Sequence, residues 1–571
     1  MRYSLEQQNV FTHKQGVGLV HAGPGTGKSA TLIGKITRLL KQGVNADAIL
    51  MLTFSASAKQ DFASRLQQQL GGTAHAVSVL TIHAFGRALI RRYYKQLGFT
   101  SRPKTIRMRR RRKAALSPAQ LKQHTTRKLK RNVIDYEDML SLPLQLFNEH
   151  PKLLTAVARR YQYLLVDELQ DINEQQATLI TLLAKQVPAV LLMGDQKQAI
   201  YGFIDADIAQ WNYIVAELKP KQYTLSHSYR IPKATLPFVN AFAADFCTDL
   251  PLISAVKGYR PLLQRFADSD AQANFIANEV TKLLKKGVSP NEIACLARVK
   301  IPLQQLTLAL DARGIKTIES HYSDTITAWS SILRKLVYIT KWMVNDQHAP
   351  IPVKSIARLL SLVKIPLREQ DALYERIIVE GVSALKMKKR SCKSEAHYKR
   401  LLSIRKSIII AAQQADAEAG IQYLIDALLP YVKNKHPHYW TQIQRDFSRL
   451  KLLARDCHWQ DVKTKSLQSL VNETGITLTT VHSAKGKEWK YVFLLNVVDG
   501  EFPLSYSKSL KQQQEEERLF YTAITRHSVK LYLLETVVNR SSFNRNSKMN
   551  HHSYCTQSDF ITPHLQYLNR R

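Results

Sequence analysis

A strand, a glycine-rich loop and a helix near the N-terminus constrain the fold of this chain more than any other feature. Residues 22–29 read Ala-Gly-Pro-Gly-Thr-Gly-Lys-Ser, and they follow a short apolar run at residues 17–20. Apolar residues at helical spacing come next. Glycines let a backbone wrap closely around a polyphosphate, and the N-terminus of the following helix attracts negative charge. The pattern predicts that the chain binds and hydrolyses a nucleoside triphosphate.

Each part of this loop has an expected role. Lys28 is expected to bind the β- and γ-phosphates, and the Ser29 hydroxyl is expected to bind Mg²⁺. The alternative, a glycine-rich turn without a ligand, is disfavoured because further nucleotide motifs follow. The residues expected to surround the phosphates are Ala22, Gly23, Pro24, Gly25, Thr26 and Gly27.

Two further apolar strand patterns end in polar residues suited to phosphate chemistry. Residues 161–166 lead into Asp167 and Glu168, of which the first would hold Mg²⁺ and the second would activate the attacking water. Residues 190–193 lead to Gln198, which would sense the γ-phosphate. Acids after a strand can also cap the next helix. Their position downstream of a phosphate loop favours the nucleotide role.

Two aromatic residues, Tyr201 and Phe203, follow the Gln198 segment. Aromatic rings next to a polar sensor suit stacking on unpaired bases. The alternative is that both rings belong to the core.

Charge points to a nucleic-acid partner. The chain has 82 Lys and Arg against 45 Asp and Glu, a net charge of +37. Residues 91–131 contain sixteen Lys and Arg and no acid, including the run Arg109-Arg110-Arg111-Arg112-Lys113, and residues 386–406 contain nine basic residues and one acid. Such dense patches fit a phosphate backbone better than a solvated surface, without distinguishing DNA from RNA.

Other compositional features suggest a cytoplasmic protein. The five cysteines lack metal-ligand spacing, and we expect reduced thiols without a zinc site. No stretch of about eighteen apolar residues is present, so no membrane span is expected. The N-terminal residues lack the apolar core of a signal peptide.

Taken in order, the motifs resemble those of superfamily 1 DNA helicases of the UvrD/Rep/PcrA type. The resemblance covers nearly the whole chain. Besides the segments above, it is carried by residues 5–7 (Leu-Glu-Gln), 52–59, 81–85 (Thr-Ile-His-Ala-Phe), 225–230 (Leu-Ser-His-Ser-Tyr-Arg), 480–489 and 515–526.

The resemblance implies roles for residues in these segments. Gln7 would read adenine, with Gln8 as the alternative reader, and Tyr229 would stack on the base. Arg230 and Arg526 would contact the γ-phosphate from a different domain than the phosphate loop, where they stabilise charge that develops during hydrolysis. Further nucleotide contacts are implied for Lys35, Gly486 and Glu488, and nucleic-acid contacts for Phe54, His83, Arg298 and His482. For Arg298, a surface arginine is the alternative.

The chain departs from the family pattern at several positions, none of which removes a predicted hydrolytic group. The departures concern how the protein binds the DNA strand, how ATP hydrolysis is coupled to movement and how efficiently duplex DNA is unwound. They are Gln196 and Lys197 in place of two acids, Phe203-Ile204-Asp205 in place of Trp-Arg-Gly, Ser228 in place of Asn, Lys487 in place of Leu, and one missing arginine before Leu519.

The motifs imply an α/β fold with two RecA-like parallel-sheet motor domains, each interrupted by a largely helical inserted subdomain. Residues 1–90 and 161–221 would form the first motor domain, and residues 91–160 its basic insertion. Residues 222–320 and 470–571 would form the second, with an accessory insertion at 321–469. The tail beyond about residue 540 is expected to be polar and loose.

The resemblance predicts an ATP-dependent DNA helicase that uses Mg²⁺, moves 3′ to 5′ on single-stranded DNA and unwinds duplex DNA at single-strand/duplex junctions. A translocase that strips proteins from single-stranded DNA and unwinds poorly by itself is one alternative. A nucleic-acid-binding scaffold gated by ATP is another. No membrane partner is expected, and the sequence identifies no loading partner.

Overall fold

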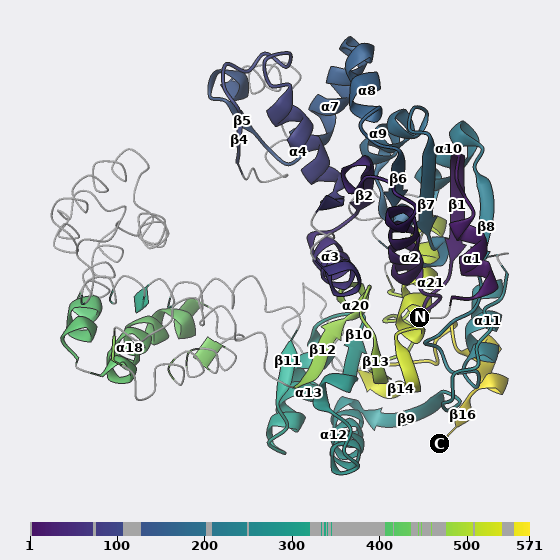
Figure 1. Cartoon of the computed structure of the whole chain (residues 1–571). Coiled ribbons are helices and arrows are strands. Elements are labelled where there is room, and N and C mark those ends of the chain that lie inside the picture. Colours follow the sequence, from purple (N-terminus) through teal and green to yellow (C-terminus); the bar gives the residue numbers. More distant parts are fainter. Residues whose placement is uncertain are drawn as a thin grey trace. The chain divides into compact units, whose positions relative to one another are not determined.

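The computed structural model describes two compact units, Met1–Thr317 with Gly475–Arg571, and Ile318–Thr474. In the first unit the described residues are 3–71, 76–106, 127–200, 208–247, 250–317, 475–505, 509–539 and 553–570. In the second they are 318–319, 406–414, 416–435 and scattered positions between 333 and 459. Figure 1 shows the elements of both units.

A six-stranded parallel sheet forms the centre of the first motor domain. The four strands between its two edges are largely buried on both faces, as expected for a parallel sheet covered by helices. In spatial order they are β3 (Ser78–Thr81), β2 (Ile49–Thr53), β6 (Tyr163–Val166), β7 (Ala189–Gly194), β1 (Gly16–Ala22) and β8 (Lys221–Leu225).

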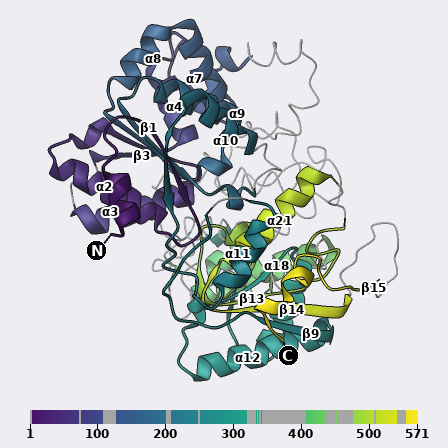
Figure 2. The same cartoon turned by 90° about the vertical axis from the view of Figure 1, so that its right-hand side faces the viewer.

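Helices cover both faces of this sheet (Figure 2). One face packs on α1 (Leu5–Phe11), α2 (Lys28–Lys41) and α3 (Ala56–Leu70). The other packs on α4 (Ile82–Arg92), α7 (Asp138–Glu149), α8 (Pro151–Ala158), α9 (Glu174–Ala184) and α10 (Ile208–Leu218). Short elements complete the domain: η1 (Ala46–Ala48), η3 (Leu169–Asp171), η4 (Gln196–Gln198), and the pair β4 (Lys104–Thr105) and β5 (Val133–Ile134).

A second sheet of eight strands forms the other motor domain. Along it run β11 (Thr317–Glu319), β12 (Ile476–Thr480), β10 (Ile293–Ala297), β13 (Trp489–Leu494), β14 (His527–Asn539), β9 (Leu262–Asp268) and β16 (Asn569–Arg570), and β15 (Ser553–Tyr554) pairs with β14 in antiparallel orientation. The central pairs from β12 to β16 are parallel. Helices α12 (Ser269–Lys285) and α13 (Ile301–Asp311) cover one face, and η6 (Pro290–Glu292) precedes β10.

The opposite face of the second sheet packs on another set of helices. They are α11 (Leu236–Ala244), α20 (Val481–Ala484), α21 (Leu510–Ile524) and η12 (Thr562–Tyr567). In the second unit, α18 (Ala417–Lys435) packs close to Trp459, whose indole N–H donates to the Gln414 carbonyl at 3.2 Å.

The predicted fold class, α/β with two RecA-like parallel sheets, is confirmed. The predicted domain limits remain predictions, although β8 pairs with β1 up to Leu225, four residues beyond the expected end of the first motor domain.

The prediction of a loose tail is wrong for residues 553–570. Ser558 and His564 are buried there, and β16 extends the second sheet. Its apolar residues, including Ile561 and Leu568, join the core beside α11.

Helices α4 and α7 approach each other closely at Gly86. A methyl group on this residue would lie 1.8 Å from the carbonyl oxygen of Met139 in α7. This contact fixes α4, which carries His83 one turn earlier, against the first turn of α7. Only glycine permits that backbone separation.

We therefore expect Gly86→Ala to lower the free energy of unfolding by about 1–3 kcal/mol, because the two backbones must move apart. Urea denaturation of the full chain measures the change. Ala88→Gly, on the exposed side of the same helix, is the control and should cost only about 1 kcal/mol. Equal stability of Gly86→Ala and the wild type would contradict the close approach.

Candidate nucleotide and nucleic-acid sites

The phosphate loop joins β1 to α2 as the sequence predicted. Gly25 and Gly27 have φ of 73° and 82°, values that L side chains rarely adopt. The Lys28 amino group donates to the carbonyls of Ala22 at 3.0 Å and Gly23 at 3.1 Å. Ser29 follows in the first turn of α2. A phosphate at this helix N-terminus would draw the Lys28 amino group away from the two carbonyls.

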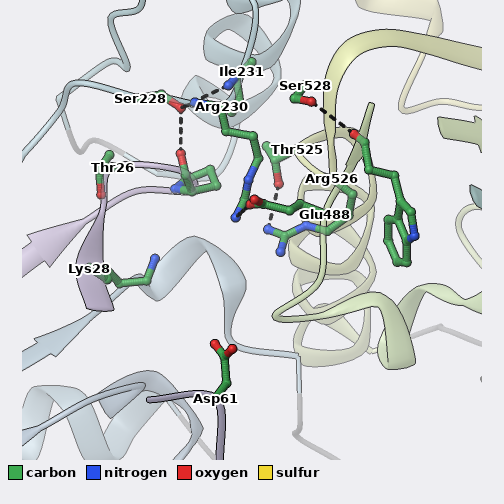
Figure 3. Close-up of polar contacts among 12 residues, drawn as sticks. Thr26, Lys28, Asp61, Ser228, Arg230, Ile231, Glu488, Thr525, Arg526 and Ser528 are labelled. Carbon is green, nitrogen blue, oxygen red and sulfur yellow. Dashed lines mark hydrogen bonds and ion pairs between the residues drawn. The ribbon is translucent and has the colours of Figure 1, made fainter. Parts of the chain in front are cut away.

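The segment 226–230 lies directly on this loop. The Ser228 hydroxyl donates to the Pro24 carbonyl at 2.9 Å, and the Tyr229 N–H donates to the Gly25 carbonyl at 2.8 Å. A methyl group on Gly25 would lie 2.6 Å from both Ser228 Oγ and Arg230 Cβ. Glycine at this position thus permits the close approach that brings Arg230 to the phosphate loop (Figure 3).

Strand β6 delivers three acids to the same edge of the sheet. Glu168 has a φ of 55°, a strained value for a residue with a side chain. Burial, reinforced by the charge of Glu168, raises the pKa of Asp167 to about 7. Burial also raises the pKa of Asp171 to about 7. Burial acts to raise the pKa of Glu168 as well, but the charges of Lys28 and Lys485 outweigh it and the pKa is lowered. Of the three acids, Glu168 is therefore the one that loses its proton most readily, as a general base requires.

The same residues fit a magnesium ion. Within the residues that the structure describes, no group of three or more His, Cys, Asp or Glu forms a metal cage. Ser29 and Asp167 nevertheless offer oxygen ligands, and Mg²⁺ in such sites takes its remaining ligands from phosphates and water. Burial and the neighbouring charge of Glu168 disfavour the ionised form of Asp167, and a bound divalent cation would favour it.

Gln198 and Arg526 meet across the two motor domains. Nη2 of Arg526 donates to the Gln198 side-chain oxygen at 2.7 Å, and the Gln198 amide donates to Asp195 at 2.6 Å. Arg526 is 2% exposed, and burial, with the nearby charge of Arg230, lowers its pKa to about 9. A buried cation next to another cation favours the arrival of an anion.

Arg230 forms an ion pair with Glu488, which lies between Arg230 and Arg526 in Figure 3. Nε of Arg230 is buried without a hydrogen-bond partner among the described residues. Buried donors are normally satisfied, and a phosphate oxygen would supply the missing acceptor. Gly486, the other predicted nucleotide contact of this segment, is exposed, with a φ of 79°.

Of the two candidate adenine readers, Gln7 is the one at the phosphate loop. Its side chain caps α1 together with Ser4, and its Nε2 is 3.4 Å from the Thr26 carbonyl. Gln8 donates to the Tyr3 carbonyl at the surface. Tyr229 is about half exposed, next to Gly27, and is free to stack on a base.

Lys35 does not reach the phosphate loop, so the prediction that it contacts the nucleotide is wrong. Its amino group donates to the carbonyls of Phe11 at 2.8 Å and His13 at 2.5 Å, and it lies 5.8 Å from the ring centre of Tyr163. His13 precedes β1, and Tyr163 begins β6, so Lys35 Nζ is at the amino-terminal edge of the sheet. Phosphates bind at the opposite edge.

A cleft of about 760 Å³ opens beside the phosphate-loop edge, between α3, α4 and the start of α7. Phe54 and His83, two of the predicted nucleic-acid contacts, line it. Burial lowers the pKa of His83 to about 4, and its Nδ1 is buried without a partner among the described residues. The remaining lining residues include Ser55, Thr81, Arg87, Tyr136, Asn173 and Gln175.

Tyr136 was not predicted from the sequence. It is 62% exposed, and its ring stacks on His83 with centroids 3.9 Å apart and planes 20° apart. A buried network holds the turn that carries it, in which Lys128 pairs with Asp135 at 3.1 Å and with Asp138 at 2.5 Å. An exposed ring on a fixed turn is a platform on which a base can stack.

Arg298 and His482 lie at the carboxyl edge of the second sheet. The Arg298 guanidinium donates to both oxygens of Glu516 in α21, at 2.6–3.1 Å, and is largely buried. This pairing differs from the simple surface arginine that was the alternative. Burial, with the charges of Arg298 and Lys485, lowers the pKa of His482 to about 4.

Several predicted contacts fall outside the described residues. They are Tyr201, Phe203 and the run at 109–113, together with all but the last residue of the second basic run at 386–406.

Two side chains that connect the motor domains, Lys485 and Arg518, were not predicted from the sequence. Lys485 pairs with Asp171 at 2.6 Å and donates to the Gln198 carbonyl, and Arg518 donates to the Ala199 carbonyl at 2.9 Å. Both residues lie inside segments that carry the family resemblance, but a motif gives no indication of which distant residue it meets.

Two families of known protein domains match this chain. Residues 3–124 and 102–218 match the UvrD/REP helicase N-terminal domain, and residues 385–537 match the UvrD-like helicase C-terminal domain. The chain belongs to the UvrD/REP helicase family. The two matches include the phosphate loop, the acids after β6 and the segment that carries Arg526.

Curated relatives span most of this UvrD-like chain. It is 23% identical to a probable DNA helicase II homologue of Mycoplasma pneumoniae over 93% of this chain and 83% of the relative. It is 23% identical to the ATP-dependent DNA helicase PcrA of Staphylococcus aureus, over 93% and 82%. The PcrA of Staphylococcus epidermidis is 22% identical, over 92% and 82%. Among the described helices, none has both the length and the apolar character that a membrane span needs.

The lowered pKa of His83 predicts that this side chain stays neutral in the cleft down to about pH 4. Wild type and His83→Asn should therefore show the same ratio of single-stranded DNA affinities at pH 5.5 and pH 7.5, measured by fluorescence anisotropy at constant salt. The comparison between the two proteins cancels the titration of the other histidines. If wild type alone binds more tightly at pH 5.5, His83 gains a proton in this range and the burial argument fails.

Proposed function

We propose that this chain is an ATP-dependent DNA helicase that moves 3′ to 5′ along single-stranded DNA and unwinds duplex DNA. The observation that carries the proposal is that Arg230 and Arg526, which follow the first sheet in sequence and belong with the second, face the phosphate loop of the first (Figure 3). ATP bound there would contact both domains at once. Its hydrolysis would change how the domains hold each other, which is what a motor requires.

The residues at the site have complementary roles in hydrolysis. Lys28 and the loop N–H groups would bind the phosphates, and Glu168 would take a proton from the attacking water. Arg230 and Arg526 would stabilise charge on the transferring phosphoryl group. Mg²⁺, held by Ser29 and Asp167, would neutralise part of the phosphate charge. Gln198 would connect the γ-phosphate to Arg526, because its oxygen already accepts from that guanidinium.

The cleft beside α4 suits a single strand better than a duplex. It combines the exposed ring of Tyr136 and the aromatic Phe54 with polar side chains, and stacking on such rings tolerates any base. The strong positive charge of the chain supplies attraction to the phosphate backbone. Direction of movement and preference for DNA come from the family, whose named relatives are DNA helicases.

Lys28→Ala should lower DNA-stimulated ATP hydrolysis at least about 100-fold, because the phosphates lose their principal cation. Single-stranded DNA binding should remain within about twofold of wild type, since Lys28 lies outside the cleft. Glu168→Gln should lower turnover equally while ATP still binds. Steady-state hydrolysis and filter binding measure both. Normal turnover in Lys28→Ala would contradict the assignment of the site.

Tyr136→Ala should weaken single-stranded DNA binding about 5- to 160-fold, the range expected for loss of about 1–3 kcal/mol of base stacking. Tyr136→Phe keeps the ring and should bind as wild type does. The basal rate of ATP hydrolysis without DNA should not change in either variant. Equal DNA affinity of Tyr136→Ala and wild type would exclude the ring as a base platform.

A further inference from the structure

Helix α1 carries two neighbouring side chains that contact different parts of the nucleotide site. Gln7 reaches the phosphate loop at the Thr26 carbonyl. Glu6 reaches the segment that leads to Arg230. Its Oε2 accepts the Ser226 N–H at 2.9 Å, its Oε1 accepts the Ser226 hydroxyl at 2.5 Å, and the His227 N–H is 3.4 Å from Oε2.

Glu6 binds Ser226, which lies only four residues before Arg230. The Ser226 carbonyl accepts the Ile253 N–H at 3.1 Å, the Ser228 N–H donates to the Ile253 carbonyl at 2.8 Å, and Ser228 is buried. The Ser228 oxygen accepts the N–H groups of Arg230 and Ile231 while its hydroxyl donates to Pro24. A shift of Ser226 therefore moves the backbone of Arg230 relative to the phosphate loop.

Helix α1 is short, and hydrogen bonds hold it at both ends. Ser4 and Gln7 form a capping box at its start. Lys35 holds its last residue through the Phe11 carbonyl, Val10 is buried in the core against the sheet, and the buried Phe11 ring packs on Tyr3 and beside Gly34 of α2. A displacement at Gln7 is therefore shared by Glu6, the adjacent residue of the same short helix.

We propose that Glu6 is a positioning residue that couples recognition of the nucleotide base to the placement of Arg230. This inference rests on the proposed function, in which Gln7 reads the base. A glutamine amide matches the donor and acceptor pair of adenine and does not match the two acceptors of guanine. Adenine would set the position of α1, and Glu6 would pass it to Arg230 through charge-assisted hydrogen bonds. ATP would then be hydrolysed faster than GTP, and not only bound more tightly.

The test compares hydrolysis of ATP and GTP by the full chain with saturating single-stranded DNA. In Glu6→Gln the side chain loses its charge, so the charge-assisted hydrogen bonds to Ser226 become weaker neutral ones. We expect kcat for ATP to fall about tenfold, KM for ATP to change less than about threefold, and kcat for GTP to stay the same. Gln7→Ala should instead raise KM for ATP. Glu174→Gln, an exposed acid in the first turn of α9, is the charge-matched control and should behave as wild type.

A purely structural role of Glu6 would lower the rates for both nucleotides equally, and an unchanged ratio of the ATP and GTP rates in Glu6→Gln would overturn the inference. Equal kcat for ATP and GTP in wild type would also overturn it, because no base recognition would then be coupled. If Glu6→Gln melts at a lower temperature, Ser226→Ala removes one of the same contacts from the other side and should lower the ATP rate alone. Failure of wild type to hydrolyse ATP faster with DNA would instead contradict the proposed function.

Discussion

The short turn η4 and the residue after it receive three cationic side chains from the second motor domain, and the site depends on these contacts. Arg526 binds the Gln198 side chain, Lys485 binds the Gln198 carbonyl, and Arg518 binds the Ala199 carbonyl. A hydrogen bond to a charged group contributes about 1.5–3 kcal/mol. Arg526 is buried and Lys485 and Arg518 are partly buried, so polar groups or an anion must meet their charge. A triphosphate between the domains would compete for them, and the arrangement of the two sheets is thereby linked to the contents of the site.

Parallel topology explains why much of this site was predictable. The phosphate loop, Asp167, Glu168 and Gln198 each follow a buried strand, and the carboxyl ends of parallel strands meet at one edge. Lys35 was assigned wrongly because position in a helix that starts at the phosphate loop does not say which edge of the sheet a side chain reaches. Its helix runs away from the loop, and two turns later the side chain contacts the residues before β1.

Residues whose roles depend on distant partners could not be found from local patterns. Glu6 meets Ser226, which is 220 positions away, and Tyr136 stacks on His83 from a segment beyond the basic run. Ser228 shows how a departure from the family pattern is accommodated. Its short side chain bonds Pro24 in the space beside Gly25, where little room remains. Lys487 is exposed next to Glu488, and surrounding residues lower its pKa by desolvation.

The most direct test of an ATP-driven motor on single-stranded DNA is the steady-state rate of ATP hydrolysis without nucleic acid and with single-stranded DNA, single-stranded RNA or duplex DNA. We predict a rise of at least about tenfold with single-stranded DNA and a much smaller rise with RNA or blunt duplex, because only an occupied cleft brings both domains onto the nucleotide. Equal rates in all four conditions would contradict coupling between the cleft and the ATP site. Equal stimulation by RNA would contradict the assignment of DNA as the track.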